Sequence, residues 1–199
     1  SGGLWVGFSG EVVDAPADEL AFHEGAAFGR ASFDLTPQDH DEYYLGYSNS
    51  VLWPVCHGRA DLMRIQPEYL EGYRRVNERI ARLLVPHLRP DDHIWVQDYQ
   101  LFPLAQELRR LGVTAPIGHF LHIPFPPTEL YQQLPWRNQI LEGLLGADLV
   151  GFQLPGGAQA RHVIRQRVDE GGDVGCVRDD VDTQALLPRS ASVTGPMQA

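Results

Sequence analysis

The 199-residue chain contains no lysine, so its sixteen Lys-plus-Arg positions are all arginine. It therefore cannot supply a P-loop lysine, a lysine Schiff base or a lysine general base. Cysteine is also scarce: Cys56 and Cys176 lie far apart in the sequence and have no C-x-x-C spacing. A disulfide framework or a structural zinc site is not expected, and a reducing compartment fits best.

Long apolar runs are missing as well. No stretch approaches the roughly 18 uncharged residues that span a bilayer, and no basic segment followed by an apolar one opens the chain. The formal net charge of −10, with no arginine-rich run, argues against binding nucleic acid. We expect a cytoplasmic protein that binds neither membrane nor nucleic acid. Because the chain begins at Ser1 without methionine, we also expect a missing upstream segment.

What is present fits an ordinary globular domain, with 43% apolar, 21% charged and 10% aromatic residues. Apolar periodicity and turn signals predict alternating strands and helices from residue 67 onward, after a surface excursion over 15–30. A helix beginning at Pro67 carries an apolar stripe from Leu70 to His87. The predicted strands cover 2–10, 31–35, 94–96, 117–123 and 149–152, and the other predicted helices cover 36–44, 101–111, 128–145 and 158–168.

This alternation predicts an α/β fold, a Rossmann-like parallel sheet with flanking helices. We assign residues 1–168 to one domain and expect an irregular or disordered tail over 169–199, where periodicity fades. Ligands of such sheets bind beyond the carboxyl ends of the strands. The residues expected along that rim are Gln97, Asp98, Tyr99, His122 and Gln153.

Two of these rim residues are candidates for chemistry. Asp98 follows a buried strand, where its carboxylate either accepts hydrogen bonds from a ligand or caps the next helix, and position alone favours neither. His122 is followed by the stiff sequence Pro-Phe-Pro-Pro, which would fix its ring against a sugar or phosphate oxygen. A lone histidine is nevertheless more often a satisfied core or turn residue.

An aromatic segment precedes them and suits carbohydrate, because ring faces pack on sugar C–H groups and polar edges bond hydroxyls. Core packing explains the same residues equally well. The glycines near the start do not form G-x-G-x-x-G, so a nicotinamide site is weakly supported, and no carboxylate pair stands out as a glycosidase acid and base. The segment contains Tyr43, Tyr44, Tyr47, Trp53, Ser48 and Asn49.

Four motifs follow one another at fixed separations: YYLGYSNSVLWPVCH (Tyr43 to His57), WVQDYQLFPLAQELR (Trp95 to Arg109), HFLHIPFPPTELYQQLPWR (His119 to Arg137) and LLGADLVGFQLPGGAQ (Leu144 to Gln159). In order and spacing they resemble the trehalose-6-phosphate synthase family, over roughly Gly2 to Val168. The resemblance implies a retaining glycosyltransferase of two-domain GT-B architecture. Such an enzyme joins glucose from UDP-glucose, or another NDP-glucose, to glucose 6-phosphate in trehalose biosynthesis.

The resemblance also implies site roles. Trp5, Tyr44, Trp53 and Asp98 match acceptor-site residues that hold glucose 6-phosphate, and His122 matches the histidine that reaches the donor glucose. Asp98 and His122 are thus the implied catalytic centre, with no cofactor and no metal. Many family members have His-Asp-Tyr-His where this chain has Gln97-Asp98-Tyr99-Gln100. Glutamine does not titrate, so neither glutamine is assigned a proton transfer.

Relative to the family pattern, we expect this chain to be the acceptor-side, N-terminal half of the enzyme. The family's first strand, phosphate-binding arginine and glycine loop would precede Ser1. Its C-terminal Rossmann domain, with the arginine and lysine that clamp the diphosphate, would be the chain's natural partner. The isolated chain is expected to have little or no activity, and a homo-oligomer is possible.

Three alternatives stay open at this point. A pseudo-glycosyltransferase could join cyclitol-like units on the same scaffold, although the set of Trp5, Tyr44 and Trp53 favours glucose 6-phosphate. A non-catalytic sugar-phosphate-binding module would bind the acceptor without turnover. A stand-alone nicotinamide dehydrogenase rests on fold analogy alone.

Overall fold

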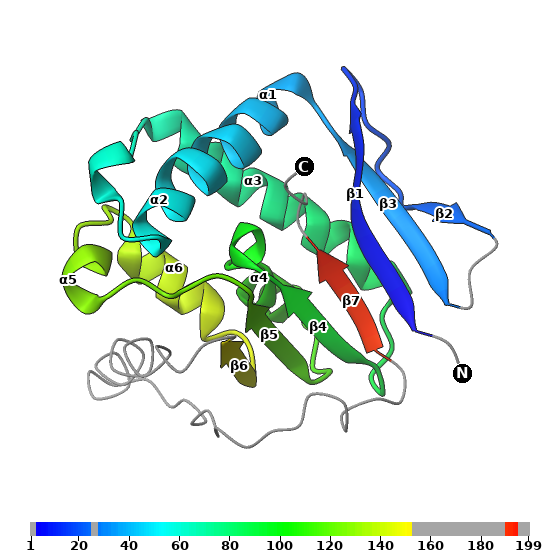
Figure 1. Ribbon diagram of the computed structural model, residues 1–199. Helices are drawn as coiled ribbons and strands as arrows, with labels where there is room; N and C mark the ends of the chain where they lie inside the picture. The colour runs from blue at the N-terminus through cyan, green and yellow to red at the C-terminus, as the bar shows by residue number, and fades with distance from the viewer. Residues whose placement is uncertain (1–2, 25–27, 153–189, 195–199) are drawn as a thin grey trace.

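A twisted, mostly parallel sheet forms the centre of the protein in the computed structural model, which describes residues 3–24, 28–152 and 190–194 (Figure 1). Its order is β2-β3-β1-β7-β4-β5-β6. Every neighbouring pair is parallel except β2 and β3, which are antiparallel. The strands are β1 (Leu4–Val12), β2 (Ala21–His23), β3 (Gly29–Leu35), β4 (His93–Gln97), β5 (Ile117–Leu121), β6 (Leu149–Phe152) and β7 (Ser190–Thr194).

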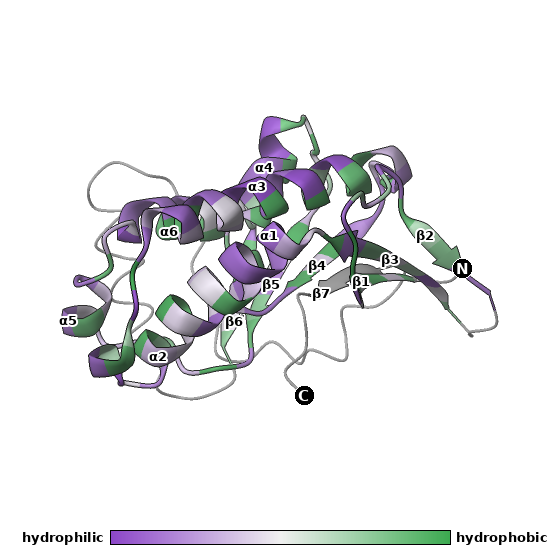
Figure 2. Cartoon of the chain, turned by 90° about the horizontal axis from the view of Figure 1, so that it is seen from above, coloured by the Kyte–Doolittle hydropathy of each residue, from purple (hydrophilic) through white to green (hydrophobic). Residues whose placement is uncertain are grey.

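The described helices pack over one face of this sheet (Figure 2). Side chains that alternate along the strands toward that face are buried, including Val6, Ile94, Val96 and Leu121. The helical segments are α1 (Pro37–Asp39), the π-helix η1 (His40–Leu52), α2 (Trp53–Cys56), η2 (Ala60–Leu62), α3 (Pro67–Leu84), η3 (Val85–His87), η4 (Tyr99–Leu101), α4 (Leu104–Arg110), α5 (Thr128–Tyr131) and α6 (Arg137–Leu144).

The aromatic segment is helical to its end, so the predicted stop at Tyr44 is wrong. Helical structure is unbroken from α1 through η1 to α2, because packing against α3 overrides the weak helix propensity of its glycine, serines and asparagine. Glycines permit this close approach. A Cβ on Gly46 would lie 2.5 Å from the Tyr69 ring, and one on Gly72 would lie 2.3 Å from the Glu42 Cβ. At each glycine, the backbone of one helix therefore packs directly against a side chain of the other.

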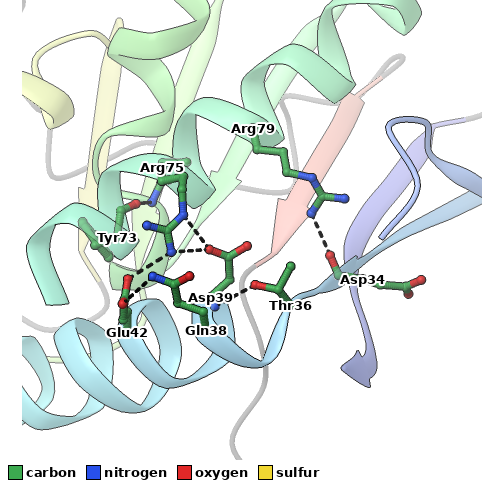
Figure 3. A network of polar contacts seen from close by, with 9 residues as sticks. Asp34, Thr36, Gln38, Asp39, Glu42, Tyr73, Arg75 and Arg79 are labelled. Atoms are coloured by element: carbon green, nitrogen blue, oxygen red, sulfur yellow. Dashed lines mark hydrogen bonds and ion pairs between the residues drawn. The ribbon is translucent and has the colours of Figure 1, made fainter. Parts of the chain in front are cut away.

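Polar contacts fix the same pair of helices (Figure 3). The Thr36 hydroxyl accepts a hydrogen bond from the Asp39 N–H at 2.9 Å, so Thr36 is the N-cap of α1. From α3, the Arg75 Nε donates to the buried Asp39 carboxylate at 2.8 Å, and its Nη2 lies 3.0 Å from Glu42. Arg79 donates to the Asp34 carbonyl at 2.7 Å. The start of the helical segment is thus anchored to α3 and to the end of β3.

Most other predicted elements are confirmed, including the helix that begins at Pro67 and the strands at 31–35, 94–96, 117–123 and 149–152. His87 is a correction: α3 ends at Leu84, and the exposed His87 ring contacts Phe22, with centroids 5.0 Å apart. The predicted excursion over 15–30 contains β2, because the antiparallel edge of β3 offers it a pairing partner.

The tail is the larger correction. Irregular structure was predicted throughout 169–199, but Ser190–Thr194 forms β7 between β1 and β4 and pairs in parallel with both. A five-residue segment of small and β-branched residues gives no clear local signal, and the two-sided pairing slot in the sheet stabilises the strand. The predicted helix over 158–168 and the boundary at 168 lie outside the described residues.

Candidate active site

Asp98 lies at the carboxyl end of β4, directly after its last residue. Its φ of 70° and ψ of 174° place it in a region that is essentially restricted to glycine, and it is the one non-glycine residue with positive φ in the described part of the chain. The carboxylate accepts a hydrogen bond from the Tyr99 N–H at 3.0 Å and so caps η4. The capping role is therefore present, and it is combined with a strained backbone.

Partial burial raises the pKa of the Asp98 carboxyl above its usual range. The backbone N–H of Tyr99, the charge and backbone N–H of His122 and the charge of His57 each oppose that rise, in decreasing order of effect. These groups surround the carboxyl from three segments of the chain. A sugar hydroxyl placed beside Asp98 would meet a carboxylate in an environment of reduced polarity, where hydrogen bonds are strong.

His122 stands at the same rim, one residue beyond the end of β5. Its Nε2 lies 2.6 Å from the Gln97 Oε1, and its ring lies 4.8 Å from the Phe120 ring between centroids. Since an amide oxygen only accepts, Nε2 carries a proton in this pairing and Nδ1 is left as an acceptor in the neutral ring. Gln97 and Phe120 thus hold the exposed imidazole in one orientation. The rim predicted from sequence brings Asp98 and His122 together.

Trp53 reaches this cluster from the helical segment. Its ring lies 5.8 Å from Tyr99 and 3.8 Å from His57, measured between centroids. The Tyr99 hydroxyl donates to the Asn49 Oδ1 at 3.0 Å, which ties η1 to η4. The half-buried Trp53 therefore lies next to the residue whose N–H the Asp98 carboxylate accepts.

The other two predicted residues come from η1 and β1. Tyr44 is half-buried in η1, with its ring centroid 5.4 Å from that of His40. Trp5 pairs with Ser192, which in turn pairs with Trp95, so Trp5 lies in the same cross-strand row as Trp95. That row is three residues short of Asp98, about 10 Å along the strand direction. Trp5 is 42% exposed in the sheet and does not share the rim.

The rim rests on a buried polar layer. The Tyr73 hydroxyl of α3 donates to the Tyr99 carbonyl at 2.5 Å and accepts from the Phe102 N–H at 3.3 Å. Asn77 donates to the carbonyls of Tyr73 and Gln100 at 2.9 and 3.1 Å.

Burial raises the pKa of the Cys56 thiol, and the charge of Asp98 adds to the rise. The thiol is therefore neutral and unsuited to nucleophilic attack.

His119, on β5, is fully buried against Phe102, and its two ring nitrogens have no hydrogen-bond partner among the described residues. Burial lowers the pKa of His119 from 6.5 to about 3, a shift that the nearby Asp98 backbone opposes and the charge of His122 increases. The folded state keeps the ring neutral, whereas the unfolded chain protonates it below about pH 6.5. Its contribution to stability is therefore complete above that pH and is lost as pH falls toward 3.

We expect the substitution His119→Phe to reduce acid sensitivity. Below pH 6.5 the wild-type chain should lose about 1.4 kcal/mol per pH unit more than the variant, or about 2 kcal/mol at pH 5. Urea unfolding of both proteins at pH 7.5 and pH 5 measures this difference. Other titrating groups, including Asp98, are common to both proteins and cancel. Equal losses in the two proteins would show that His119 is not buried in its neutral form.

Three residues of the site were missed from sequence. Gln97 is expected on the rim, but its contact with His122 is not. The two residues lie at the carboxyl ends of the neighbouring strands β4 and β5. His57 lies four residues after Trp53 in a helix, a spacing that puts both side chains on one face. Tyr73 falls within the apolar stripe of α3, and nothing in that pattern indicates that its hydroxyl holds η4.

The described residues contain no group of three or more histidines, cysteines, aspartates or glutamates that could hold a metal ion. None of the helices within the described ranges is long and apolar enough to cross a membrane.

The Rossmann-like parallel sheet, with a carboxylate and an imidazole at its carboxyl rim, matches one part of solved GT-B glycosyltransferases. The chain belongs to glycosyltransferase family 20, whose family model matches residues 1–168. It is 49% identical over 155 residues to the trehalose-6-phosphate synthase of Cronobacter sakazakii, covering 77% of this chain and 32% of that protein. The chain thus spans about a third of this relative's length.

Solved structures of trehalose-phosphate synthases are similar to this chain as well. The chain resembles an alpha,alpha-trehalose-phosphate synthase (UDP-forming) from Burkholderia xenovorans, solved in complex with glucose-6-phosphate, with a TM-score of 0.78 and 43% identity over 82% of this chain and 37% of that one. It also resembles an E. coli structure described as trehalose-6-phosphate bound with UDP-2-fluoro glucose. That match has a TM-score of 0.78 and 45% identity over 84% of this chain and 37% of the other. The fold and family expected from the motifs are confirmed.

Proposed function

We propose that this chain forms the acceptor side of an enzyme that transfers glucose from UDP-glucose, or another NDP-glucose, to glucose 6-phosphate and so makes trehalose 6-phosphate. The observation that carries the proposal is the convergence of Asp98 and His122 on one rim of the sheet, where the paired strands β4 and β5 end. Relatives solved with glucose-6-phosphate and with UDP-2-fluoro glucose support the choice of substrates.

In this proposal, Asp98 accepts a hydrogen bond from an acceptor hydroxyl and fixes its direction. Trp53 and Tyr44 confine the acceptor ring beside the helical segment, and His122 contacts the donor glucose. Trp5 is left out, because it lies about 10 Å short of the rim. The effect of such positioning is large, since a misplacement of about 1 Å can cost roughly 100-fold in rate.

The chemical step follows from the same arrangement. With no protein nucleophile assigned, the acceptor hydroxyl attacks the anomeric carbon on the face from which the nucleotide phosphate departs, and the configuration is retained. The hydroxyl proton passes to the departing phosphate oxygen. Cationic groups of the complete enzyme stabilise the charge on the departing diphosphate. No cofactor and no metal take part in the proposed reaction. The 199-residue chain alone should have little or no activity, because the partner that binds the nucleotide is expected to be the rest of the same enzyme.

The test is a product assay on the full-length protein that contains this chain. With UDP-glucose and glucose 6-phosphate, we expect trehalose 6-phosphate and UDP to form in equal amounts, detected by NMR and mass spectrometry. Omitting glucose 6-phosphate is the control, and it should abolish UDP release. Hydrolysis of UDP-glucose at the same rate without acceptor, or binding of both substrates without product, would contradict the proposal. The second outcome would instead favour a non-catalytic sugar-phosphate-binding module.

A further inference from the structure

His57 is held in one orientation at the end of α2. Its Nδ1 lies 2.8 Å from the Trp53 carbonyl oxygen, and because a carbonyl only accepts, Nδ1 carries the proton. The imidazole also packs on the Trp53 indole, with ring centroids 3.8 Å apart and planes inclined at 37°. Gly58 follows with a φ of 73°, which turns the chain away immediately after the histidine. The ring position is therefore set by three local features.

The second ring nitrogen of His57, Nε2, is available to accept a hydrogen bond from a ligand. His57 is exposed, and its Nε2 makes no hydrogen bond to any residue that the structure describes. In a neutral imidazole whose Nδ1 is protonated, Nε2 carries a lone pair and accepts hydrogen bonds. The site thus contains a fixed acceptor that the fold itself does not use.

His57 belongs to the rim around Asp98. The Trp53 ring that supports it also lies 5.8 Å from Tyr99, whose N–H donates to the Asp98 carboxylate at 3.0 Å. His57 is also near enough to Asp98 that its protonated form would lower the pKa of that carboxyl. The His57 imidazole therefore lies against the indole that the proposed function places beside the acceptor ring.

We propose that His57 is a further acceptor-site residue, whose Nε2 accepts a hydrogen bond from a second hydroxyl of the phosphorylated hexose held by Asp98. The inference rests on the proposed function and deepens it. Two acceptors, one carboxylate and one imidazole, then face the ring from β4 and from α2. A site whose acceptors match the hydroxyls of its ligand discriminates against analogues that lack those hydroxyls.

Two substitutions separate this role from a purely structural one. His57→Asn places an amide near the position of Nδ1, so it can still donate to the Trp53 carbonyl but has nothing at Nε2. His57→Gln places its amide oxygen near Nε2 and gives up the bond to the carbonyl. The 199-residue chain is titrated with glucose 6-phosphate while the histidine Cε1–Hε1 signals are followed by NMR, with Asp98→Ala as the control for binding at the rim.

We expect the His57 signal to shift together with that of His122. His57→Asn should weaken binding about tenfold, the value of one hydrogen bond, and His57→Gln by less than about threefold. A structural role predicts the reverse, with His57→Gln the less stable protein in urea unfolding and His57→Asn binding as the wild type does. That result, or a His57 signal that stays fixed during Asp98-dependent binding, overturns this inference and leaves the proposed function standing. If the wild-type chain shows no Asp98-dependent binding, this inference fails, whereas the proposed function is decided separately by the product assay on the full-length protein.

Discussion

Replacing Asp98 with alanine should reduce kcat/KM for glucose 6-phosphate in the full-length protein by about 100-fold or more, because the carboxylate that orients the acceptor is lost. The same substitution in the 199-residue chain leaves the strained backbone in place, since alanine also disfavours a φ of 70° combined with a ψ of 174°. Asp98→Gly removes the carboxylate but tolerates this conformation. We therefore expect the glycine variant to be more stable than the alanine variant by about 1–3 kcal/mol.

Steady-state kinetics with glucose 6-phosphate and urea unfolding measure the two effects separately. Asp98→Asn is the matched control, because an amide oxygen can still accept from the Tyr99 N–H and asparagine tolerates positive φ better than alanine. It should keep most of the stability and lose most of the activity. If all three variants kept normal acceptor kinetics, the role of Asp98 in the site would be wrong. Equal stability of the glycine and alanine variants would show that the backbone is not strained at this position.

The second large effect is expected from Tyr73→Phe. Removing this hydroxyl leaves the Tyr99 carbonyl and the Phe102 N–H without their bonds in a fully buried layer. An unsatisfied buried group costs about 1–3 kcal/mol, so the variant should lose about 2–4 kcal/mol of unfolding free energy. Because Tyr73 holds both ends of η4, the turn that presents Asp98 should loosen as well.

Tyr43→Phe provides the comparison. Tyr43 is equally buried and stacks on Tyr73 with centroids 5.8 Å apart, but its hydroxyl has no partner among the described residues. Its removal should therefore change stability little or increase it. Urea unfolding of both variants gives the difference, and acceptor kinetics report whether η4 has moved. Similar losses in the two variants would mean that the bonds of Tyr73 do not account for the stability of the layer.

Local patterns in the sequence were sufficient for much of the fold. Pro67 and the apolar stripe behind it predicted α3, because helical periodicity is set within one segment. Short apolar runs between turn signals predicted β4, β5 and β6 in the same way. The end of the helical segment after Tyr44 could not be found, since its stability comes from Gly46 and Gly72, which lie far apart in sequence and permit close packing.

The sequence pattern also predicted part of the candidate site, and the tertiary structure decided the rest. Asp98 and His122 each follow a strand that can be recognised locally, and parallel strands end at one edge, so their convergence was determined by the sequence pattern. The contacts that orient them were decided by the tertiary structure. Gln97 meets His122 across 25 positions of the sequence, and Tyr73 reaches the Tyr99 carbonyl across 26. Helical and strand periodicity relate residues only a few positions apart, so they cannot predict contacts across such sequence separations.

Trp5 and Ser190–Thr194 show most clearly what local sequence patterns cannot predict. The sequence by itself determined which segments become strands with apolar faces, because alternation and turn residues act over a few neighbours. Only the tertiary structure decided that β7 inserts between β1 and β4, and that Trp5 therefore lies in the row of Trp95 rather than at the rim. Strand order and register depend on pairing between distant segments, and that free energy exists only once the sheet has formed.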